Sequence, residues 1–382
     1  MSADWIGPAA EALARHAERE LEALVAVSSP SGDRHGAEEA LALCAALLPD
    51  SARIERLECS SPGHAPDLLA TLSGTGRRRL LLLGHVDTVV GHDEHRPLRR
   101  VGDRLVGSGA VDMKGGVVLG LGAFAFLART AGAAFAEAAL LLVCDEEWRT
   151  APFAHAERFA GWDACLCFEA GQRGPGDEEG VVVRRKAAGT LRVSATGASA
   201  HSGSAPDRGR NALLALAEAA RAVAACHDPG GPERLTAVPT VLRSGEAFNV
   251  VPAGGELYCD LRADREAAFD AVADAVPDEV GGARLATGFV RRWPGMDSRA
   301  ATGELLERAS AALGRPIVPV ERGGASDASH VAVHVPVTID GLGPRGGGAH
   351  APQEFVLAPT LRERAEVALA ILGALLELPQ RM

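Results

Sequence analysis

Residues 80–95 read LLLLGHVDTVVGHDEH, so four consecutive leucines are followed almost at once by His85 and Asp87. An apolar run of this length is typical of a strand buried on both faces of a sheet. A buried strand gains no stability from ionisable side chains at its tip. We therefore expect His85 and Asp87 to belong to a binding site at the end of this strand.

Two further apolar runs end in acidic residues, namely AALLLVCDEE (residues 138–147) and DACLCFEA (residues 163–170). A stretch rich in small residues, GGVVLGLGAFAFLARTAG (115–132), lies between the first two runs and predicts a helix that ends near Gly132. This alternation predicts an α/β fold whose sheet is mixed, mostly parallel and flanked by helices. Ligands in such folds bind beyond the carboxyl ends of the strands, so the polar residues should share one edge of the sheet.

The pattern changes near residue 189, where TLRVSATGASAHSG (190–203) alternates as a half-exposed strand does. The order strand, helix, strand, strand, helix, strand that follows predicts an α+β domain with an antiparallel sheet. We therefore predict two domains: a catalytic domain formed by 1–188 and 295–382, and an inserted domain at 189–294.

Composition excludes several classes of partner. The 382 residues carry a formal net charge of −11, which argues against a nucleic acid or an anionic membrane as partner. The first 20 residues lack the apolar segment of a secretory signal, and the longest apolar stretch, 117–128, is judged too short to span a bilayer. The seven cysteines form no disulfide-like framework, and Cys165 and Cys167 alternate as core residues would. These features predict a reduced, cytoplasmic protein with no membrane partner.

Four carboxylates and two imidazoles are expected at the polar edge of the sheet. They would repel one another in an empty site, and divalent metal is the natural compensation. Histidine with carboxylate suits zinc, with cobalt or manganese as alternatives. Two ions that share one carboxylate would use five ligands and leave one carboxylate for proton transfer. Asp87 could accept the second N–H of the His85 imidazole and orient it. The six side chains are His85, Asp112, Glu146, Glu147, Glu169 and His350.

Nine motifs, in sequence order, carry a family resemblance: GHVDTV, GAVDMKGG, CDEE, CFEAG, SAHSG, FNVVP, CDLR, GGASDAS and the late GAH. Together they resemble the di-zinc amidohydrolase family of bacterial glutamate carboxypeptidase, succinyl-diaminopimelate desuccinylase, acetylornithine deacetylase and aminoacylase. Each motif alone is weak, but nine in the right order are specific. The resemblance extends from about Glu20 to the end of the chain.

The resemblance implies a role for each residue of the metal site. Asp112 would bridge two metal ions. His85 and Glu169 would complete one site, and Glu147 and His350 the other. Glu146 would act as the general base that takes a proton from water and passes it to the leaving amine. The family also implies a cis peptide bond between Asp112 and Met113.

The resemblance gives the inserted domain the roles of a lid and a dimerisation domain, so a homodimer is expected. His201 would reach into the partner subunit's site and steady the oxyanion. Asn249 and Arg262 would hold the free carboxylate of a small-molecule or peptide substrate, because the guanidinium fork matches a carboxylate. Gly324 and Ser326 would contact the substrate through a loop. Asp327, in the same motif, is interpreted as structural.

The leading functional hypothesis is a glutamate-carboxypeptidase-like hydrolase that releases a C-terminal amino acid from a peptide or an N-acyl amino acid. The alternatives are a deacylase of the acetylornithine or diaminopimelate type, and a non-catalytic binding protein of the same fold. In FVRRWPGMD (residues 289–297), Arg291 or Arg292 could supply an arginine found in glutamate-specific relatives. Trp293 stands where a second one is expected, which leaves room for an apolar or aromatic side chain.

Overall fold

The computed structural model describes residues 3–130 and 132–377, and it divides into two compact units. The smaller unit comprises Arg185–Met296 and the short segment Arg322–Ala325, and the larger unit comprises the other described residues. The segment Arg322–Ala325 was not anticipated from the sequence. The assignment of catalytic and lid roles to two domains stays a prediction.

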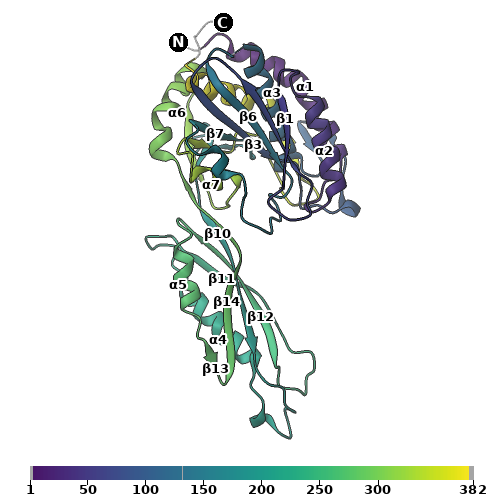
Figure 1. Cartoon of the computed structure of the whole chain (residues 1–382), viewed down its shortest axis with the longest axis vertical. Coiled ribbons are helices and arrows are strands. Elements are labelled where there is room, and N and C mark those ends of the chain that lie inside the picture. Colours follow the sequence, from purple (N-terminus) through teal and green to yellow (C-terminus); the bar gives the residue numbers. More distant parts are fainter. Residues whose placement is uncertain (1–2, 131, 378–382) are drawn as a thin grey trace. The chain divides into compact units, whose positions relative to one another are not determined.

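A six-stranded mixed sheet forms the centre of the larger unit, with strand order β1-β2-β6-β3-β7-β17 (Figure 1). β3 runs parallel to both β6 and β7, and β2 runs antiparallel to β6. The predicted mixed, mostly parallel sheet is therefore confirmed. Its strands are β1 (Arg53–Leu57), β2 (Asp67–Ser73), β3 (Arg78–His85), β6 (Phe135–Val143), β7 (Ala164–Cys167) and β17 (Thr338–Ile339).

The four leucines of β3 are buried because both faces of the sheet are covered. Helix α3 contacts β3 and β6, with α1 and α8 packed against it, and α7 contacts β7 and β3. Side chains alternate between the two faces of a strand, so a strand covered on both sides must be apolar at every position. The helices are α1 (Ile6–Ala26), α2 (Arg34–Ala46), α3 (Gly115–Thr130), α6 (Arg299–Leu313), α7 (Asp327–Ala332) and α8 (Pro359–Leu375).

The helical segment Ala110–Thr130 corrects one expectation. Its 21 residues and mean hydropathy of 1.5 make it long and apolar enough to cross a membrane by length and composition, so the argument from the short stretch 117–128 was wrong. Within the structure, 83% of its most apolar window is buried, as in the core helix of many soluble proteins. One such helix is therefore a weak indication of a membrane span.

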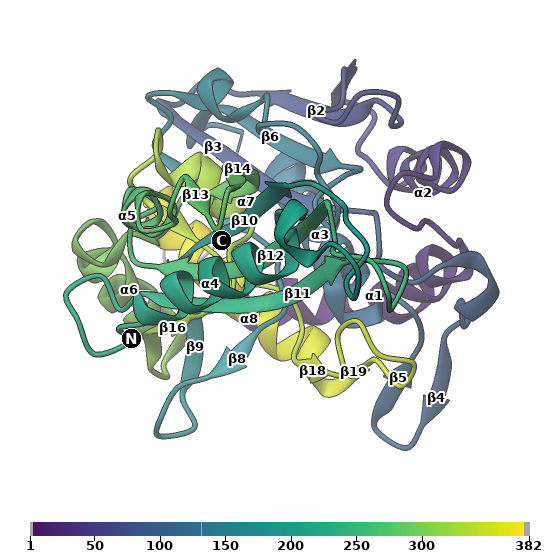
Figure 2. The same cartoon turned by 90° about the horizontal axis from the view of Figure 1, so that it is seen from below.

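Two small sheets complete the larger unit. One has the strand order β18-β19-β5-β4 (Figure 2), and the other contains β15-β9-β16 with β8 paired to β9. The first sheet matters for the site because the chain between β18 and β19 carries His350. The strands are β4 (Arg99–Val101), β5 (Arg104–Val106), β8 (Gln172–Arg173), β9 (Glu179–Arg185), β15 (Met296–Asp297), β16 (Ile317–Arg322), β18 (Gly346–Gly347) and β19 (Phe355–Leu357).

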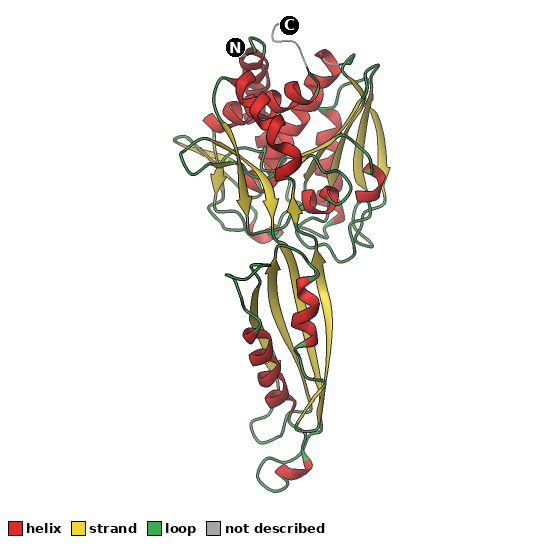
Figure 3. Cartoon of the chain, turned by 90° about the vertical axis from the view of Figure 1, so that its left-hand side faces the viewer, coloured by secondary structure: helices red, strands yellow, loops and turns green. Residues whose placement is uncertain are grey.

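The smaller unit is a five-stranded antiparallel sheet with the order β11-β12-β10-β14-β13, and its helices lie against one face (Figure 3). Along β12, Leu257, Cys259 and Leu261 are buried, whereas the residues between them are part exposed. The alternation predicted for residues 190–203 is confirmed along β10, where Leu191, Val193 and Ala195 are buried and the residues between them are part exposed or exposed. The predicted order of elements is confirmed apart from the added two-residue β13. The elements are β10 (Ala187–Thr196), α4 (Ala212–Ala225), β11 (Thr236–Ser244), β12 (Gly254–Ala263), α5 (Ala268–Asp274), β13 (Glu279–Val280) and β14 (Ala283–Trp293).

A substitution at Gly116 tests how closely α3 approaches the segment that follows β7. A Cβ atom at Gly116 would lie 1.8 Å from the carbonyl oxygen of Phe168, which real Cβ atoms do not do. We expect Gly116→Ala to lower the free energy of unfolding by about 3 kcal/mol through overpacking. This corresponds to a fall in Tm of roughly 6–12 °C, measured by calorimetry.

Gly7→Ala in α1 is the matched control, because a Cβ atom there has no neighbour within 4 Å. Alanine is the better helix former, so this control should keep or slightly raise the Tm. An unchanged Tm in Gly116→Ala would contradict the close approach.

Candidate metal centre

Three parallel strands bring the predicted polar residues together. His85 is the last residue of β3, Glu146 and Glu147 follow β6 closely, and Glu169 follows β7. The carboxyl ends of parallel strands lie at the same edge of a sheet, so these side chains meet there. The apolar runs in the sequence end in acids and histidine for this reason.

Two loops bring in the remaining members. Asp112 lies in the turn that precedes α3, and its peptide bond to Met113 is cis, as predicted. His350 has a φ of +63°, in the left-handed region that few non-glycine residues adopt. Backbone strain of this kind persists where the surrounding structure enforces it and is concentrated at functional sites.

Asp112 lies between two groups of potential ligands. Its Oδ1 is 3.3 Å from Nε2 of His85, which is 3.6 Å from Oε1 of Glu169. Its Oδ2 is 3.2 Å from Nε2 of His350, which is also 3.2 Å from Oε2 of Glu147. Within each group one ligand atom per residue lies within 4.8 Å of the others, which is close enough to share an ion.

The imidazole nitrogens and carboxylate oxygens of these groups are suitable ligands for a divalent cation. Nε2 of His85 and Oε1 of Glu147 are buried and make no hydrogen bond among the described residues. Buried polar atoms are almost always hydrogen-bonded, so unsatisfied ones at a site of imidazole and carboxylate donors point to a metal. The geometry allows one ion per group, with Asp112 common to both.

The charges of the site act strongly on one another. Burial alone would raise the pKa of Asp112, but the neighbouring imidazoles of His350 and His85 hold it well below its usual range. The carboxylates of Asp112 and Glu147 raise the pKa of His350 to about 10. Burial opposes the charged form of His85, yet Asp112 and Asp87 raise its pKa well above the ordinary value. Without a cation, protons therefore supply the compensating charge.

Glu146 differs from its neighbours because it belongs to neither group of ligands. Glu146 is only 9% exposed, and burial raises the pKa of its carboxyl well above the ordinary value. The negative charges of Glu169 and Asp327 raise that pKa further, against the influence of His85. A carboxyl whose pKa is raised in this way is suited both to accept and to deliver a proton.

Asp87 makes contacts beyond the one predicted. Nδ1 of His85 lies 3.0 Å from the backbone carbonyl oxygen of Asp87 and 3.3 Å from its Oδ1, so the carbonyl is the nearer partner. The carboxylate instead accepts the backbone N–H groups of Glu146 (3.2 Å) and Glu147 (3.1 Å). Asp87 therefore fixes the histidine and both glutamates at once.

Four predicted site residues belong to the smaller unit, namely His201, Asn249, Arg262 and Gly324. Nδ1 of His201 accepts the backbone N–H groups of Gly203 (3.1 Å) and Ser204 (3.2 Å), which places the proton of the neutral imidazole on Nε2. The side chain of Asn249 is exposed. Their predicted roles toward the substrate stay predictions.

Two of the three arginines considered for substrate binding already have acidic partners. Arg262 holds both carboxylate oxygens of Asp260, at 3.0 and 2.9 Å. Arg292 pairs with Asp270, and Arg291 lies over the ring of the buried Trp293 at 4.4 Å.

The predicted substrate loop is also engaged within the protein. The carbonyl oxygen of Gly324 accepts a hydrogen bond from Arg185 (2.8 Å) within the smaller unit. The hydroxyl of Ser326 is buried and donates to Oδ2 of Asp340 (2.7 Å). A direct contact of this hydroxyl with a substrate would require the loop to move.

Sequence reasoning missed Glu354, which holds the turn that carries Asp112. Its carboxylate accepts the backbone N–H groups of Gly109 (2.9 Å), Val111 (2.8 Å) and Asp112 (2.9 Å). Burial raises its pKa to about 7, against the effect of these three donors. Only its place four residues after His350 linked it to the site, and that spacing carries no specific signal.

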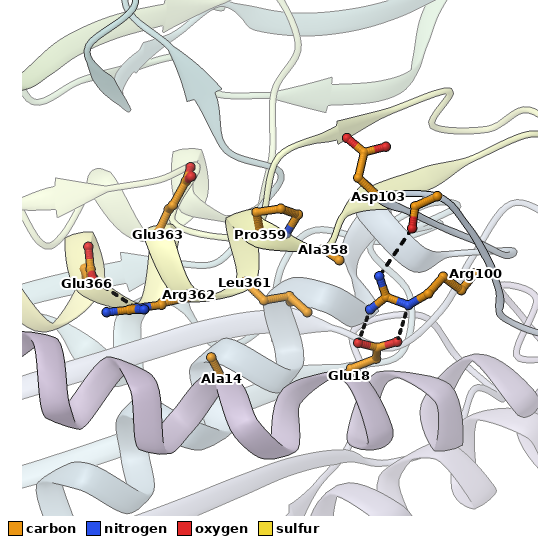
Figure 4. A pocket seen from close by; sticks show the side chains of 11 residues that line it. Ala14, Glu18, Arg100, Asp103, Ala358, Pro359, Leu361, Arg362, Glu363 and Glu366 are labelled. Atoms are coloured by element: carbon orange, nitrogen blue, oxygen red, sulfur yellow. Dashed lines mark hydrogen bonds and ion pairs between the residues drawn. The ribbon is translucent and has the colours of Figure 1, made fainter.

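A surface groove of about 770 Å³ contains none of the candidate residues (Figure 4). Its charged side chains pair with one another, as Arg100 does with Glu18 and Arg362 with Glu366. This groove therefore contributes no residue to the candidate metal centre.

Glu354→Gln tests the support of the Asp112 turn. The amide keeps one acceptor oxygen, loses the charge and turns an N–H₂ group toward at least one backbone donor. We expect the affinity for zinc to fall about 10–100-fold, measured by titration against a chelating competitor. Glu18→Gln, at a paired glutamate of the groove, should leave the affinity unchanged, and an equal affinity in both variants would contradict the role of Glu354.

Solved structures share this fold over nearly the whole chain. An aminopeptidase PepT from Bacillus cereus aligns with a TM-score of 0.77 and 20% sequence identity, and covers 95% of this chain and 98% of its own. The M20 family metallo-carboxypeptidase Sso-CP2 from Sulfolobus solfataricus aligns with a TM-score of 0.73 and 16% identity, over 95% and 99% of the two chains. At these identities the likeness shows the fold.

Curated relatives are more informative about chemistry. Carboxypeptidase G2 from Pseudomonas sp. (strain RS-16) is 26% identical over 368 residues, which cover 92% of this chain and 87% of the relative. Succinyl-diaminopimelate desuccinylase from Rhodospirillum centenum is 29% identical over 350 residues, 83% and 86% of the two chains. The sequence model of peptidase family M20/M25/M40 matches residues 81–374. The predicted resemblance is thereby confirmed: the chain belongs to peptidase family M20/M25/M40 and is a metal-dependent peptidase or amidohydrolase.

Proposed function

We propose that this enzyme cleaves an amide bond next to a free carboxylate and releases a C-terminal amino acid from a peptide or an N-acyl amino acid. The observation that carries the proposal is the position of Asp112 between two histidine–carboxylate groups, with the buried Glu146 beside them. The likeness to carboxypeptidase G2 over 92% of the chain supports this branch of the family.

We propose two divalent ions as cofactors, zinc in the first place, with cobalt or manganese as alternatives. Asp112 would bridge them, His85 and Glu169 would hold one, and Glu147 and His350 would hold the other. When bound, such ions polarise the scissile carbonyl group and lower the pKa of a water molecule.

Glu146 then carries the proton. Its carboxylate accepts a proton from the attacking water, holds it in a buried site that favours the neutral carboxyl, and delivers it to the leaving amine. Asp87 keeps Glu146 in place through the backbone N–H group, so the carboxylate need not be ordered anew in each turnover.

The smaller unit supplies groups of the right chemistry for the substrate. Nε2–H of His201 is the donor proposed to steady the oxyanion. Arg262 and Asn249 are proposed to bind the free carboxylate of the substrate. That carboxylate would compete with Asp260 for the guanidinium group of Arg262.

We also propose a homodimer formed through the smaller unit. β11 is an edge strand of the sheet, and Leu242 on it and Leu214 on α4 are exposed, the latter to 63%. Exposed apolar side chains on an edge strand and its adjacent helix suit pairing with a second copy about a two-fold axis.

A second candidate is a deacylase of a biosynthetic amine, favoured by the 29% identity to succinyl-diaminopimelate desuccinylase. A binding protein without activity is disfavoured because Asp112 and Glu146 are both present. Both candidates retain the same metal ligands, so only substrates separate the two enzymes.

The test is hydrolysis of a panel of dipeptides, N-acyl amino acids, N-acetylornithine and succinyl-diaminopimelate, with zinc, cobalt or manganese and with a chelator. Release should require metal and a free α-carboxylate. A preference for one of the two biosynthetic amides would favour the second candidate.

Glu146→Gln should lower kcat about 10²–10⁴-fold while bound metal, measured by mass spectrometry, is unchanged. Glu304→Gln, at an exposed position of α6, is the matched control and should retain full activity. Activity that survives in Glu146→Gln would refute the proposed base.

The dimer is tested with Leu214→Glu and Leu242→Glu, which place charges in the proposed interface. We expect sedimentation to show a dimer for the wild type and a shift toward monomer for both variants. Val101→Glu, at an exposed apolar residue of the larger unit, should leave the association unchanged. A monomeric wild type would exclude the dimer.

A further inference from the structure

A buried ion triad lies beside the proposed base. Arg149 donates from Nε (3.1 Å) and Nη2 (2.8 Å) to Oδ1 of Asp145, and from Nη1 and Nη2 to the two carboxylate oxygens of Asp327. The three side chains are only 0%, 0% and 5% exposed. The guanidinium also lies 4.6 Å from the centre of the Phe153 ring.

Net stabilisation does not explain such a triad well. Moving one guanidinium and two carboxylates out of water costs free energy that their attraction offsets only in part, and apolar residues of similar volume often do as well. What apolar residues cannot provide is a fixed direction, because the planar fork of arginine aligns both carboxylates. The triad therefore contributes geometry.

That geometry concerns the loop that presents Glu146. Asp145 and Arg149 bracket residues 146–148, and both ends of the loop are tied to Ser61. The N–H group of Ser61 donates to Oδ2 of Asp145 (2.9 Å), and its hydroxyl accepts the N–H group of Thr150 (2.9 Å). The loop is closed at its base and is held by Asp87, which follows β3, and Arg149 joins it to a further element.

That other element is α7, which begins at Asp327. The preceding residue, Ser326, donates to Asp340, so the start of α7 is itself anchored. Arg149 therefore connects the loop of Glu146 to the anchored start of α7.

We propose that Arg149 is a positioning residue for Glu146: its fork between Asp145 and Asp327 holds the loop in the geometry that proton transfer requires. The inference rests on the proposed role of Glu146 as the base. Asp327, interpreted from the sequence as structural, becomes the second anchor of this device. A point charge alone does not suffice, because only a planar fork satisfies both carboxylates in one orientation.

Arg149→Lys keeps the charge and removes the fork. We expect kcat to fall about 10–100-fold, with KM and bound metal within about twofold of the wild type, because a displaced catalytic group slows the chemical step more than it weakens binding. Asp327→Asn is the second variant. It keeps the pair of Arg149 with Asp145, and it should lower kcat by at least about tenfold.

Arg364→Lys is the matched control for the loss of a buried arginine fork. Arg364 is fully buried, pairs with Glu179 (2.9 Å) and donates to the carbonyl oxygen of Gly341 (2.7 Å). Its Tm should fall as much as that of Arg149→Lys, while its kcat stays within about threefold of the wild type. A purely structural role of Arg149 would make the two variants alike in kcat.

The outcomes separate this inference from the proposed function. If Glu146→Gln is inactive but folded Arg149→Lys retains kcat, the positioning role is overturned and the base stands. If Arg149→Lys does not fold, the kcat of Asp327→Asn tests the positioning role instead. A wild-type kcat in Asp327→Asn overturns the proposal. If Glu146→Gln retains activity, the proposed function fails first.

Discussion

Repulsion among carboxylates buried at one edge of a sheet is the constraint that the larger unit is built around. Asp112, Glu147 and Glu169 contribute to two groups of ligands, and Glu146 lies next to them without joining either. Such a cluster is unfavourable unless cations or protons compensate it. In the absence of a cation, the raised pKa of His350 and the lowered pKa of Asp112 favour a protonated imidazole beside an ionised carboxylate. Divalent metal is the compensation that the family uses for catalysis.

The rest of the unit holds these charges at fixed positions. The parallel arrangement of β3, β6 and β7 brings three loops to one edge. Backbone N–H groups then fix the loops, since Asp87 accepts two of them and Glu354 accepts three. In both cases a carboxylate outside the two candidate groups orients residues within them, as outer residues usually do around a metal site.

The sequence was most informative where the signal is local. One buried strand ends in His85, and another is followed closely by Glu146 and Glu147. These local patterns predict the candidate site residues without any knowledge of distant contacts. No predicted strand leads directly to Asp112 or His350, and their individual roles as ligands came from the family resemblance. The contacts of Glu354 and Arg149 join residues up to 245 and 178 positions apart, and no periodicity encodes such pairs. The nearer partner of His85 is a backbone carbonyl, which side-chain identities do not reveal.

The contacts of Asp87 have a consequence for how the site fills. The backbone carbonyl of Asp87 contacts His85 of the first group, and the Asp87 carboxylate accepts the backbone N–H group of Glu147 in the second. Ordering either group therefore orders part of the other, in addition to the shared Asp112. In thermodynamic terms the two ligand sets are linked, and the linkage is reciprocal. An ion bound at one group lowers the entropic cost of binding at the other, and this favours positive cooperativity unless repulsion between the ions outweighs it.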